Sequence, residues 1–301
     1  MRIVYSPRYH VDIGTHVFPT IKYQRLYDRL DQLEYVHYDE LIEPQPVTWD
    51  ELATVHSAEY LDKLKTGDFT IPELAQLELP WSPEIVEGFR LMSGGTLTAA
   101  RALAKPGGPA ALVHLGGGFH HAFANHGEGF CVFNDVAIAI RVLRAESEIE
   151  RTAVIDCDVH HGNGTAFIFQ DDPSVFTFSI HQQYNYPMFK PRSSLDIGLD
   201  DGTGDEAYVE ALERAMPQVL ASRPQLAFYL AGADPYEDDQ LGGLRLTFDG
   251  LRRRDRVVLT ACRDAGVPVV VTLAGGYARD LEDTVKIHLN TVEEVRRVRN
   301  R

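Results

Sequence analysis

The chain has 301 residues, of which 44% are hydrophobic and 24% are charged, a balance typical of a globular protein. Its formal net charge of −15 argues against a direct nucleic-acid partner, because general nucleic-acid binders present a basic surface. We expect a cytoplasmic protein with no membrane partner, because no hydrophobic run is long enough to cross a bilayer and the N-terminus lacks a signal-peptide layout.

Short hydrophobic runs alternate with longer helical patterns along the chain. The predicted strands cover residues 2–6, 110–115, 152–158, 175–180, 226–232 and 267–275. The predicted helices cover residues 20–33, 57–67, 93–104, 134–150, 206–222 and 248–266. Fully apolar strands separated by helices indicate a mainly parallel sheet covered on both faces. No linker or repeat divides the chain, so we expect residues 1–301 to form one α/β domain with three α/β/α layers.

A polar, glycine-rich segment follows each of five predicted strands. These segments are HLGGGFHH, DVHHGNG, SIHQQYNYP, GADPYEDD and GGYARD, which begin at residues 114, 158, 179, 232 and 275. In parallel sheets the ligand site lies beyond the carboxyl ends of the strands. We therefore expect these five loops to converge on one site.

Asp158 and His160 lie two residues apart, so they point to the same side if the strand geometry persists. With Asp234 from another strand end they would form a three-ligand set, which leaves a coordination position open, as in catalytic zinc sites. A lone Asp-x-His is more often a turn cap beside a satisfied polar residue. Here four further polar loops accompany it, which favours a metal site. The three cysteines show no paired spacing that would suggest a cysteine zinc cage.

His120 and His121 form a second candidate constellation. Adjacent residues point to opposite sides of a strand, but both can reach one cavity from a loop. Paired histidines are candidates for general acid and base at neutral pH. Taken alone the pair is weak, because the three preceding glycines also fit an ordinary strand-to-helix turn.

These segments, together with GFCVFNDVAIAI, resemble the signature segments of the histone deacetylase family in the arginase-deacetylase superfamily. They run in order from YSPRYH through VHSAEYL to AGGY, so the resemblance spans nearly the whole chain, and it is strongest to the bacterial and class IV-like branch. It implies a zinc-dependent amidohydrolase that removes an acetyl or longer acyl group from the ε-amine of lysine or a related amine. Ferrous iron is an alternative metal, because oxygen and nitrogen ligands accept both ions.

The resemblance also implies the roles of individual residues. The metal ligands are Asp158, His160 and Asp234. The catalytic residues are His120, His121, Asp156, Asn163 and Tyr277. The substrate-binding residues are Gly129, Phe130, Tyr186 and Leu241. A structural monovalent cation, typically potassium, would be bound by Asp156, Asp158, His160, Ser179 and Ile180.

Within the catalytic set, Asp156 would orient His120, and Tyr277 would donate a hydrogen bond to the substrate carbonyl. Asn163, at a position that is often aspartate in the family, should partner His121. A neutral partner stabilises an imidazolium less than a carboxylate does. We therefore expect His121 to be the more easily deprotonated histidine and a candidate base.

Three alternatives remain open at this point. The acidic residue that holds the peptide backbone in many protein deacetylases has no obvious match, since the segment reads LPWSPEIVEG with Trp81 near that position. An acetylpolyamine or another small acylated amine is therefore an alternative substrate. A two-metal ureohydrolase is disfavoured, because Gly162 and Tyr236 occupy the positions of its additional carboxylates. A catalytically silent acyl-ligand binding protein is also disfavoured, because the metal ligands, the histidine pair and the tyrosine are all present.

Overall fold

The computed structural model describes residues 2–36, 40–147 and 149–299. These residues form a single α/β domain around an eight-stranded sheet in which all neighbouring strands are parallel. The order across the sheet is β2 (Leu41–Ile42), β1 (Ile3–Val4), β3 (Ala111–His114), β8 (Val269–Thr272), β7 (Leu226–Leu230), β4 (Thr152–Asp156), β5 (Val175–Gln182) and β6 (Leu195–Leu199). The predicted α/β class and largely parallel sheet are confirmed.

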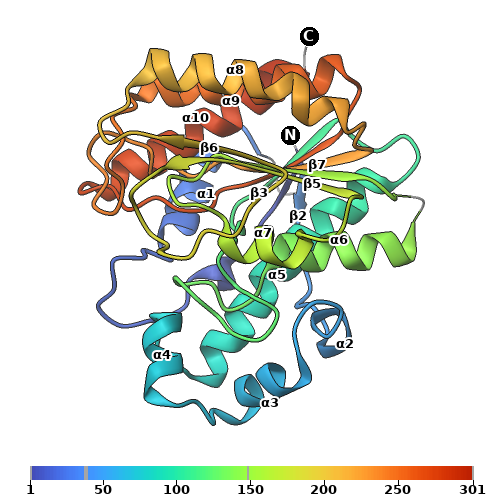
Figure 1. Cartoon of the computed structure of the whole chain (residues 1–301), viewed down its shortest axis with the longest axis vertical. Coiled ribbons are helices and arrows are strands. Elements are labelled where there is room, and N and C mark those ends of the chain that lie inside the picture. Colours follow the sequence, from blue (N-terminus) through green and yellow to red (C-terminus); the bar gives the residue numbers. More distant parts are fainter. Residues whose placement is uncertain (1, 37–39, 148, 300–301) are drawn as a thin grey trace.

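Helices cover both faces of the sheet, which gives the three predicted layers (Figure 1). One face is covered by α8 (Asp205–Ala221), α9 (Phe248–Asp264) and α10 (Leu281–Arg299), and α1 (Lys22–Gln32) packs against α10. The other face is covered by α5 (Pro83–Ala104), α6 (Asp135–Glu146) and α7 (Asn163–Phe169). Farther from the sheet lie α2 (Trp49–Leu52), α3 (Ala58–Thr66) and α4 (Ile71–Leu77), and a 3₁₀ turn covers Pro7–Tyr9.

The central strands are apolar because both of their faces are covered. Every residue of β3, β4, β7 and β8 is buried, which agrees with their continuous runs of hydrophobic side chains. Since these strands are parallel neighbours, the loops that follow them open at the same edge of the sheet. The candidate site residues lie in these loops.

Several elements differ from the sequence prediction. The helix predicted over residues 93–104 is the second half of α5, which begins at Pro83 after the N-cap Ser82. The strand predicted over residues 152–158 ends at Asp156, so strand alternation does not orient the residues that follow. The strands β2 and β6 and the helix α10 were not predicted.

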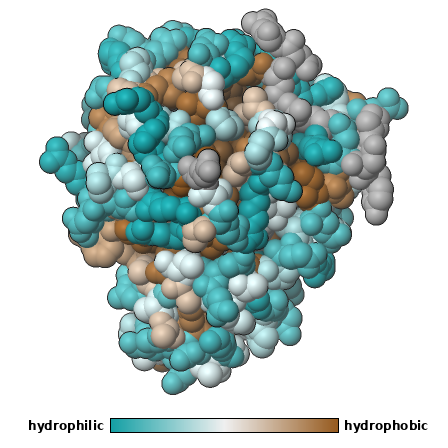
Figure 2. Space-filling model, turned by 90° about the vertical axis from the view of Figure 1, so that its right-hand side faces the viewer, coloured by the Kyte–Doolittle hydropathy of each residue, from teal (hydrophilic) through white to brown (hydrophobic). Residues whose placement is uncertain are grey.

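The surface is mostly polar. In Figure 2 hydrophilic residues cover most of the visible face, and hydrophobic residues reach the surface in separate patches. Among the described residues, no helix combines the length and the hydrophobicity that a bilayer crossing requires.

Candidate metal centre and active site

The three expected metal ligands come together beyond the ends of β4 and β7. Each offers one ligand atom, and the ligand atoms of Asp158, His160 and Asp234 lie within 4.8 Å of one another. Asp158 and His160 lie in a loop, where Asp158 Oδ1 accepts a hydrogen bond from the His160 backbone N–H at 2.9 Å. Asp234 Oδ1 accepts one from the Val159 N–H at 2.9 Å, which ties the two loops together. The loop backbone, rather than a continued strand, therefore aligns these ligands.

The ligand set fits a divalent cation. All three side chains are buried, and Asp234 Oδ2 has no hydrogen-bond partner among the described residues. Burial and the nearby Asp158 carboxylate raise the pKa of Asp234 to about 7. A Cβ atom at Gly275 would lie 1.9 Å from Asp234 Oδ2, so the backbone of the next loop approaches the ligands closely. Buried, facing carboxylates are costly without a cation, and two carboxylates with one imidazole suit zinc or ferrous iron.

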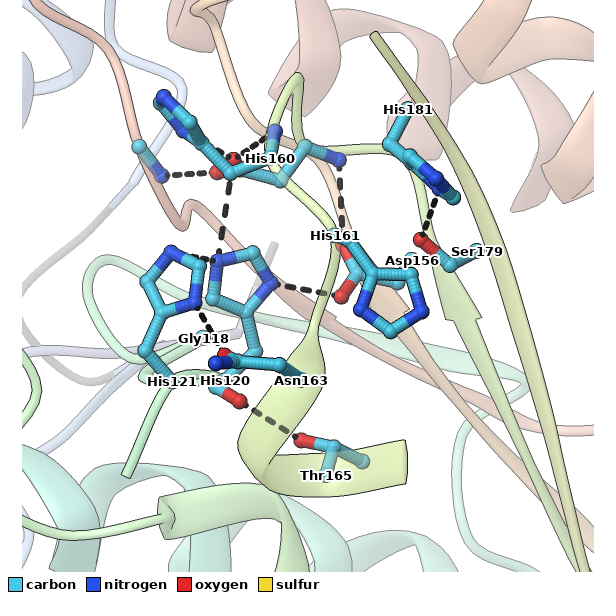
Figure 3. Close-up of polar contacts among 12 residues, drawn as sticks. Gly118, His120, His121, Asp156, His160, His161, Asn163, Thr165, Ser179 and His181 are labelled. Carbon is cyan, nitrogen blue, oxygen red and sulfur yellow. Dashed lines mark hydrogen bonds and ion pairs between the residues drawn. The ribbon is translucent and has the colours of Figure 1, made fainter. Parts of the chain in front are cut away.

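His120 and His121 form a hydrogen-bonded pair beside these ligands (Figure 3). Their Nε2 atoms lie 3.0 Å apart, and His120 Nδ1 donates to Asp156 Oδ2 at 2.7 Å. Burial lowers the pKa of His120, but the negative charges of Asp156 and Asp158 outweigh it and raise the pKa to about 9. Burial and the charge of His120 hold the pKa of His121 well below its usual value. The two histidines therefore differ in the direction that the sequence predicts.

Asn163 connects His121 to an acidic residue that the sequence analysis did not select. Asn163 Oδ1 accepts a hydrogen bond from His121 Nδ1 at 2.7 Å, and Asn163 Nδ2 donates to Glu128 Oε1 at 2.6 Å. The expected pairing of Asn163 with His121 is thus present in the structure. Glu128 lies just before the Gly129–Phe130 segment, and its place in the motif GEGFC was the signal that could have found it.

Tyr277 enters the site from the loop that follows β8. Its side chain is buried and lines a narrow cavity together with His121, His160 and Phe130. Burial raises the pKa of the phenol well above its usual value, so the hydroxyl keeps its proton and can donate a hydrogen bond. Tyr277 therefore faces the same space as the metal ligands and the histidine pair.

Two of the residues expected to bind substrate, Gly129 and Phe130, line this cavity, and Tyr186 packs against the ring of His121. The ring centroids of Phe130 and Tyr277 lie 5.9 Å apart, and those of Tyr186 and His121 lie 5.1 Å apart. Gly129 has a φ of +51°, and a Cβ there would lie 2.9 Å from both the His121 ring and the Tyr186 hydroxyl. The cavity measures about 20 Å³. Asp158 and His160 are among the residues that line it.

Leu241 lies in the loop after β7, and its side chain is half-buried against the hydrophobic core. Its backbone N–H donates to Asp239 Oδ1 at 2.8 Å, and its carbonyl accepts from Asn185 Nδ2 at 2.8 Å. Asn185 directly precedes Tyr186 in the chain. The backbone of Leu241 thus anchors the segment that carries Tyr186.

The sequence analysis also missed a buried cation, Lys22. Its ammonium donates to the carbonyl of Ala274 at 2.9 Å and lies 5.8 Å from the centroid of the Tyr277 ring. Burial lowers the pKa of Lys22 to about 8, against the opposing charges of Asp234 and Asp158. The helical pattern of residues 20–33 suggested only an amphipathic helix, and a lysine at its start carries no distinct signal.

The structure shows what Trp81 and Glu78, in the segment before α5, contact. Trp81 Nε1 donates to the Leu64 carbonyl at 2.9 Å, so Trp81 fastens the end of α3. Glu78 lies nearer the site, because the preceding residue accepts a hydrogen bond from the Phe130 N–H at 3.0 Å. The Glu78 carbonyl also contacts His16 Nε2 at 2.9 Å, and the His16 ring packs edge-on against Phe130. Glu78 thus lies beside the segment that contains Phe130.

The residues expected to bind a monovalent cation lie on two adjacent strands. Asp156 of β4 is opposite Ser179 of β5, and Ile180 is the next residue along β5. The Asp158 N–H donates to Asp156 Oδ1 at 3.1 Å, so the start of the ligand loop turns back toward the strand pair. The binding of a monovalent cation by these residues and His160 stays a prediction.

A second cluster of His and Asp residues lies nearby. His161, His181 and Asp196 each place one potential ligand atom within 4.8 Å of the others. Hydrogen bonds already engage these groups, because Asp196 contacts His161 Nε2 at 3.2 Å and the Ser193 N–H at 2.8 Å. His181 Nδ1 contacts the Ser179 hydroxyl at 3.0 Å. The cluster fastens both ends of the segment between β5 and β6 to the loop after β4.

The comparisons with known proteins agree with this geometry. The histone deacetylase domain model matches residues 16–292. An uncharacterised protein of Picosynechococcus is 40% identical over 95% of this chain and 95% of its own length. A histone deacetylase-like amidohydrolase of Pseudomonas aeruginosa is 32% identical over 77% of this chain and 65% of its own length. The crystal structure of the HDA15 HD domain superimposes with a TM-score of 0.79 at 22% identity, covering 99% of this chain and 96% of that one. The chain therefore belongs to the histone deacetylase family.

Proposed function

We propose that this protein is a metal-dependent amidohydrolase that removes a short acyl group from the ε-amine of lysine or from a small acylated amine. The observation that carries the proposal is the unpartnered Asp234 Oδ2 within a buried three-ligand set. The histidine pair and Tyr277 line the same cavity, so groups for proton transfer and for carbonyl binding lie beside a cation site. Family membership supports a deacetylase or amidohydrolase role.

Asp158, His160 and Asp234 would hold the metal, with zinc as our first choice and ferrous iron as the alternative. When bound, the metal would polarise the amide carbonyl and lower the pKa of water toward neutrality. Potassium is proposed at Asp156, Asp158, His160, Ser179 and Ile180, where it would neutralise charge behind the ligand loop.

The side chains of the chain supply the other steps. His121, whose pKa is lowered, would accept a proton from the attacking water, and a histidine of the pair would return a proton to the leaving amine. The Tyr277 hydroxyl would donate a hydrogen bond to the oxygen that gains negative charge as the carbonyl becomes tetrahedral. His120, held by Asp156, would keep a positive charge near that oxygen.

The tunnel would select the substrate by shape. Phe130 and Tyr186 are proposed as its aromatic walls, suited to the methylene stem of a lysine or a polyamine. Leu241 would add a further wall, and the Gly129 carbonyl would accept the substrate N–H. The resemblance of the chain to deacetylases and to a histone deacetylase-like amidohydrolase supports an acetyl group as the first substrate to test.

The entrance leaves two substrate classes to be separated by experiment. Glu78 could accept a hydrogen bond from a peptide N–H or pair with a second ammonium group of a polyamine. The test compares acetyl-lysine peptide, myristoyl-lysine peptide and an acetylated polyamine as substrates of the zinc-loaded protein, with Tyr277→Phe as the control. We expect turnover of an acetylated substrate that collapses in the control. Absence of turnover for all three with metal bound would contradict the proposal.

A further inference from the structure

We propose that Glu128 is a positioning residue that fixes the orientation of the Asn163 amide and, through it, the tautomer of His121. This inference rests on the proposed function, because it gives Glu128 a task in the proton transfer that His121 would perform.

Glu128 accepts hydrogen bonds from several neighbours at once. Asn163 Nδ2 donates to Oε1 at 2.6 Å, and Gln76 Nε2 and His126 Nε2 contact Oε2 at 2.9 Å and 3.4 Å. Its side chain is 13% exposed, so these bonds are poorly replaced by water. Burial alone would raise the pKa of Glu128, but these hydrogen bonds lower it below its usual value. Glu128 is therefore a carboxylate, which can only accept hydrogen bonds.

Because Glu128 can only accept, it determines which group donates in each hydrogen bond from Glu128 through Asn163 to His121. Since Glu128 cannot donate, the Asn163 amide must present its NH₂ group to Glu128 and its oxygen to His121. The amide oxygen cannot donate either, so His121 Nδ1 must carry the hydrogen in that 2.7 Å contact. His121 Nε2 is then the nitrogen left to take up a proton (Figure 3). The tautomer of His121 thus follows from the carboxylate at position 128.

Without the carboxylate, only the contact between His120 Nε2 and His121 Nε2 would favour this orientation of the Asn163 amide. An amide has nearly the same shape when its oxygen and nitrogen are exchanged. In the exchanged orientation its NH₂ group would face His121 Nδ1, which would then need a lone pair, and the hydrogen would move to Nε2. That tautomer cannot act as a base at Nε2. An aspartate at position 163 would need no such selection, because both of its oxygens accept.

Glu128 also contacts Tyr186, which is proposed as a wall of the tunnel, and this second contact needs its own control variant. The Tyr186 hydroxyl forms a hydrogen bond with Glu128. Loss of Glu128 could therefore loosen substrate binding as well as disturb His121. Tyr186→Phe removes only the wall contact, and we expect it to change KM more than kcat.

The test is a double-mutant cycle between positions 128 and 163 in the zinc-loaded protein. We expect Glu128→Gln to lower kcat by about 10- to 100-fold, part of the 10²–10⁴ that acid–base catalysis supplies. Asn163→Asp should also lower kcat, because it places two carboxylates against each other. The double variant exchanges the amide and the carboxylate and should recover most of the loss. Glu210→Gln on α8, which replaces an exposed carboxylate that pairs with Arg214, is the matched control and should leave kcat unchanged.

The proposal is wrong if the losses of kcat are additive, so that kcat of the double variant is lower than that of either single variant. A purely structural role predicts that result. A second measurement does not depend on turnover. Long-range ¹H–¹⁵N spectra of ¹⁵N-histidine-labelled protein should show His121 protonated at Nδ1 in the wild type and a mixture of tautomers in Glu128→Gln. An unchanged tautomer would refute the role of Glu128 even if no substrate were found. A changed tautomer without turnover of any substrate would count against the proposed function only.

Discussion

Asp239 Oδ2 accepts a hydrogen bond from the backbone N–H of Tyr277 at 2.7 Å. Its other oxygen, Oδ1, accepts the N–H groups of Leu241 at 2.8 Å and Gly242 at 3.0 Å. One buried carboxylate thus joins the loop after β7 to the loop after β8. The position of the Tyr277 phenol depends on this junction.

The first prediction concerns this junction. In Asp239→Asn, one amide group can no longer accept all three N–H groups, so the Tyr277 loop should shift or lose a bond. We expect kcat to fall about tenfold, equivalent to about 1.4 kcal/mol of barrier, while the metal content stays at the wild-type value. Steady-state kinetics together with metal analysis of the purified variant checks this. An unchanged kcat would show that the backbone of the loop holds Tyr277 without Asp239.

The second prediction concerns the Tyr277 hydroxyl itself. Tyr277→Phe should lower kcat by about 10²–10³, the usual cost of losing one donor to a developing oxyanion. Metal binding should change little, because the hydroxyl is not among the proposed metal ligands. Tyr236→Phe is the control, since it removes a hydroxyl that bonds Asp283 in the first turn of α10. Similar losses in both variants would argue against an oxyanion role.

The third prediction is that metal binding stabilises the fold through Asp158 and its partners. A cation that binds only the folded state at a free concentration 100 times its Kd adds about 2.7 kcal/mol to the free energy of unfolding. Chelation should therefore lower the Tm of the wild type, and Asp158→Ala should abolish that difference. Thermal unfolding with zinc and with chelator measures both. The assignment is wrong if Asp158→Ala still binds one zinc as tightly as the wild type.

The fourth prediction concerns the effect of pH on the free energy of unfolding through His56. His56 Nδ1 donates to the Phe123 carbonyl at 3.0 Å, and His56 Nε2 accepts the Asn134 N–H at 3.1 Å. Burial lowers its pKa to about 4 from 6.5, so the unfolded chain binds one more proton between these values. The free energy of unfolding should therefore fall by up to about 3 kcal/mol as the pH drops from 6.5 to 4.

Urea unfolding of wild type and His56→Gln at pH 7 and pH 4.5 tests this. Both proteins should be measured with the metal removed by chelation, so that metal release does not contribute to the difference. The variant should show a smaller loss of stability on acidification than the wild type. Parallel losses would mean that His56 is not buried in its neutral form.

The central strands were predictable because burial on both faces leaves a continuous hydrophobic run. The runs over residues 152–158 and 226–232 contain β4 and β7 for this reason. The two strands at the edges of the sheet lack that signal. β2 has only two residues, and in β6, which reads LDIGL, half-buried and exposed residues alternate until Leu199. Edge strands are stabilised by pairing rather than by burial, so composition does not reveal them.

In the candidate site, too, some residues were predictable from the sequence and others were not. Charged residues at strand ends, such as Asp158 and Asp234, stand out because an apolar run precedes them. Asp239 and Lys22 act through contacts with segments far away in the chain, and nothing in their own neighbourhood distinguishes them from surface charges. Their partners become visible only once the loops are placed together. The metal ligands, the histidine pair and Tyr277 stay predictions in their roles, although the structure brings them together.

The position of β8 in the sheet has a consequence for biosynthesis. β8 lies between β3 and β7 and separates the strands of the first part of the chain from the group formed by β7, β4, β5 and β6. A nascent chain that has not yet released residues 269–272 from the ribosome therefore holds two unconnected strand groups with apolar edges. Contacts between residues so distant in sequence form slowly, and incomplete sheets are prone to aggregate. We expect the two strand groups to join into one sheet only when this last strand inserts.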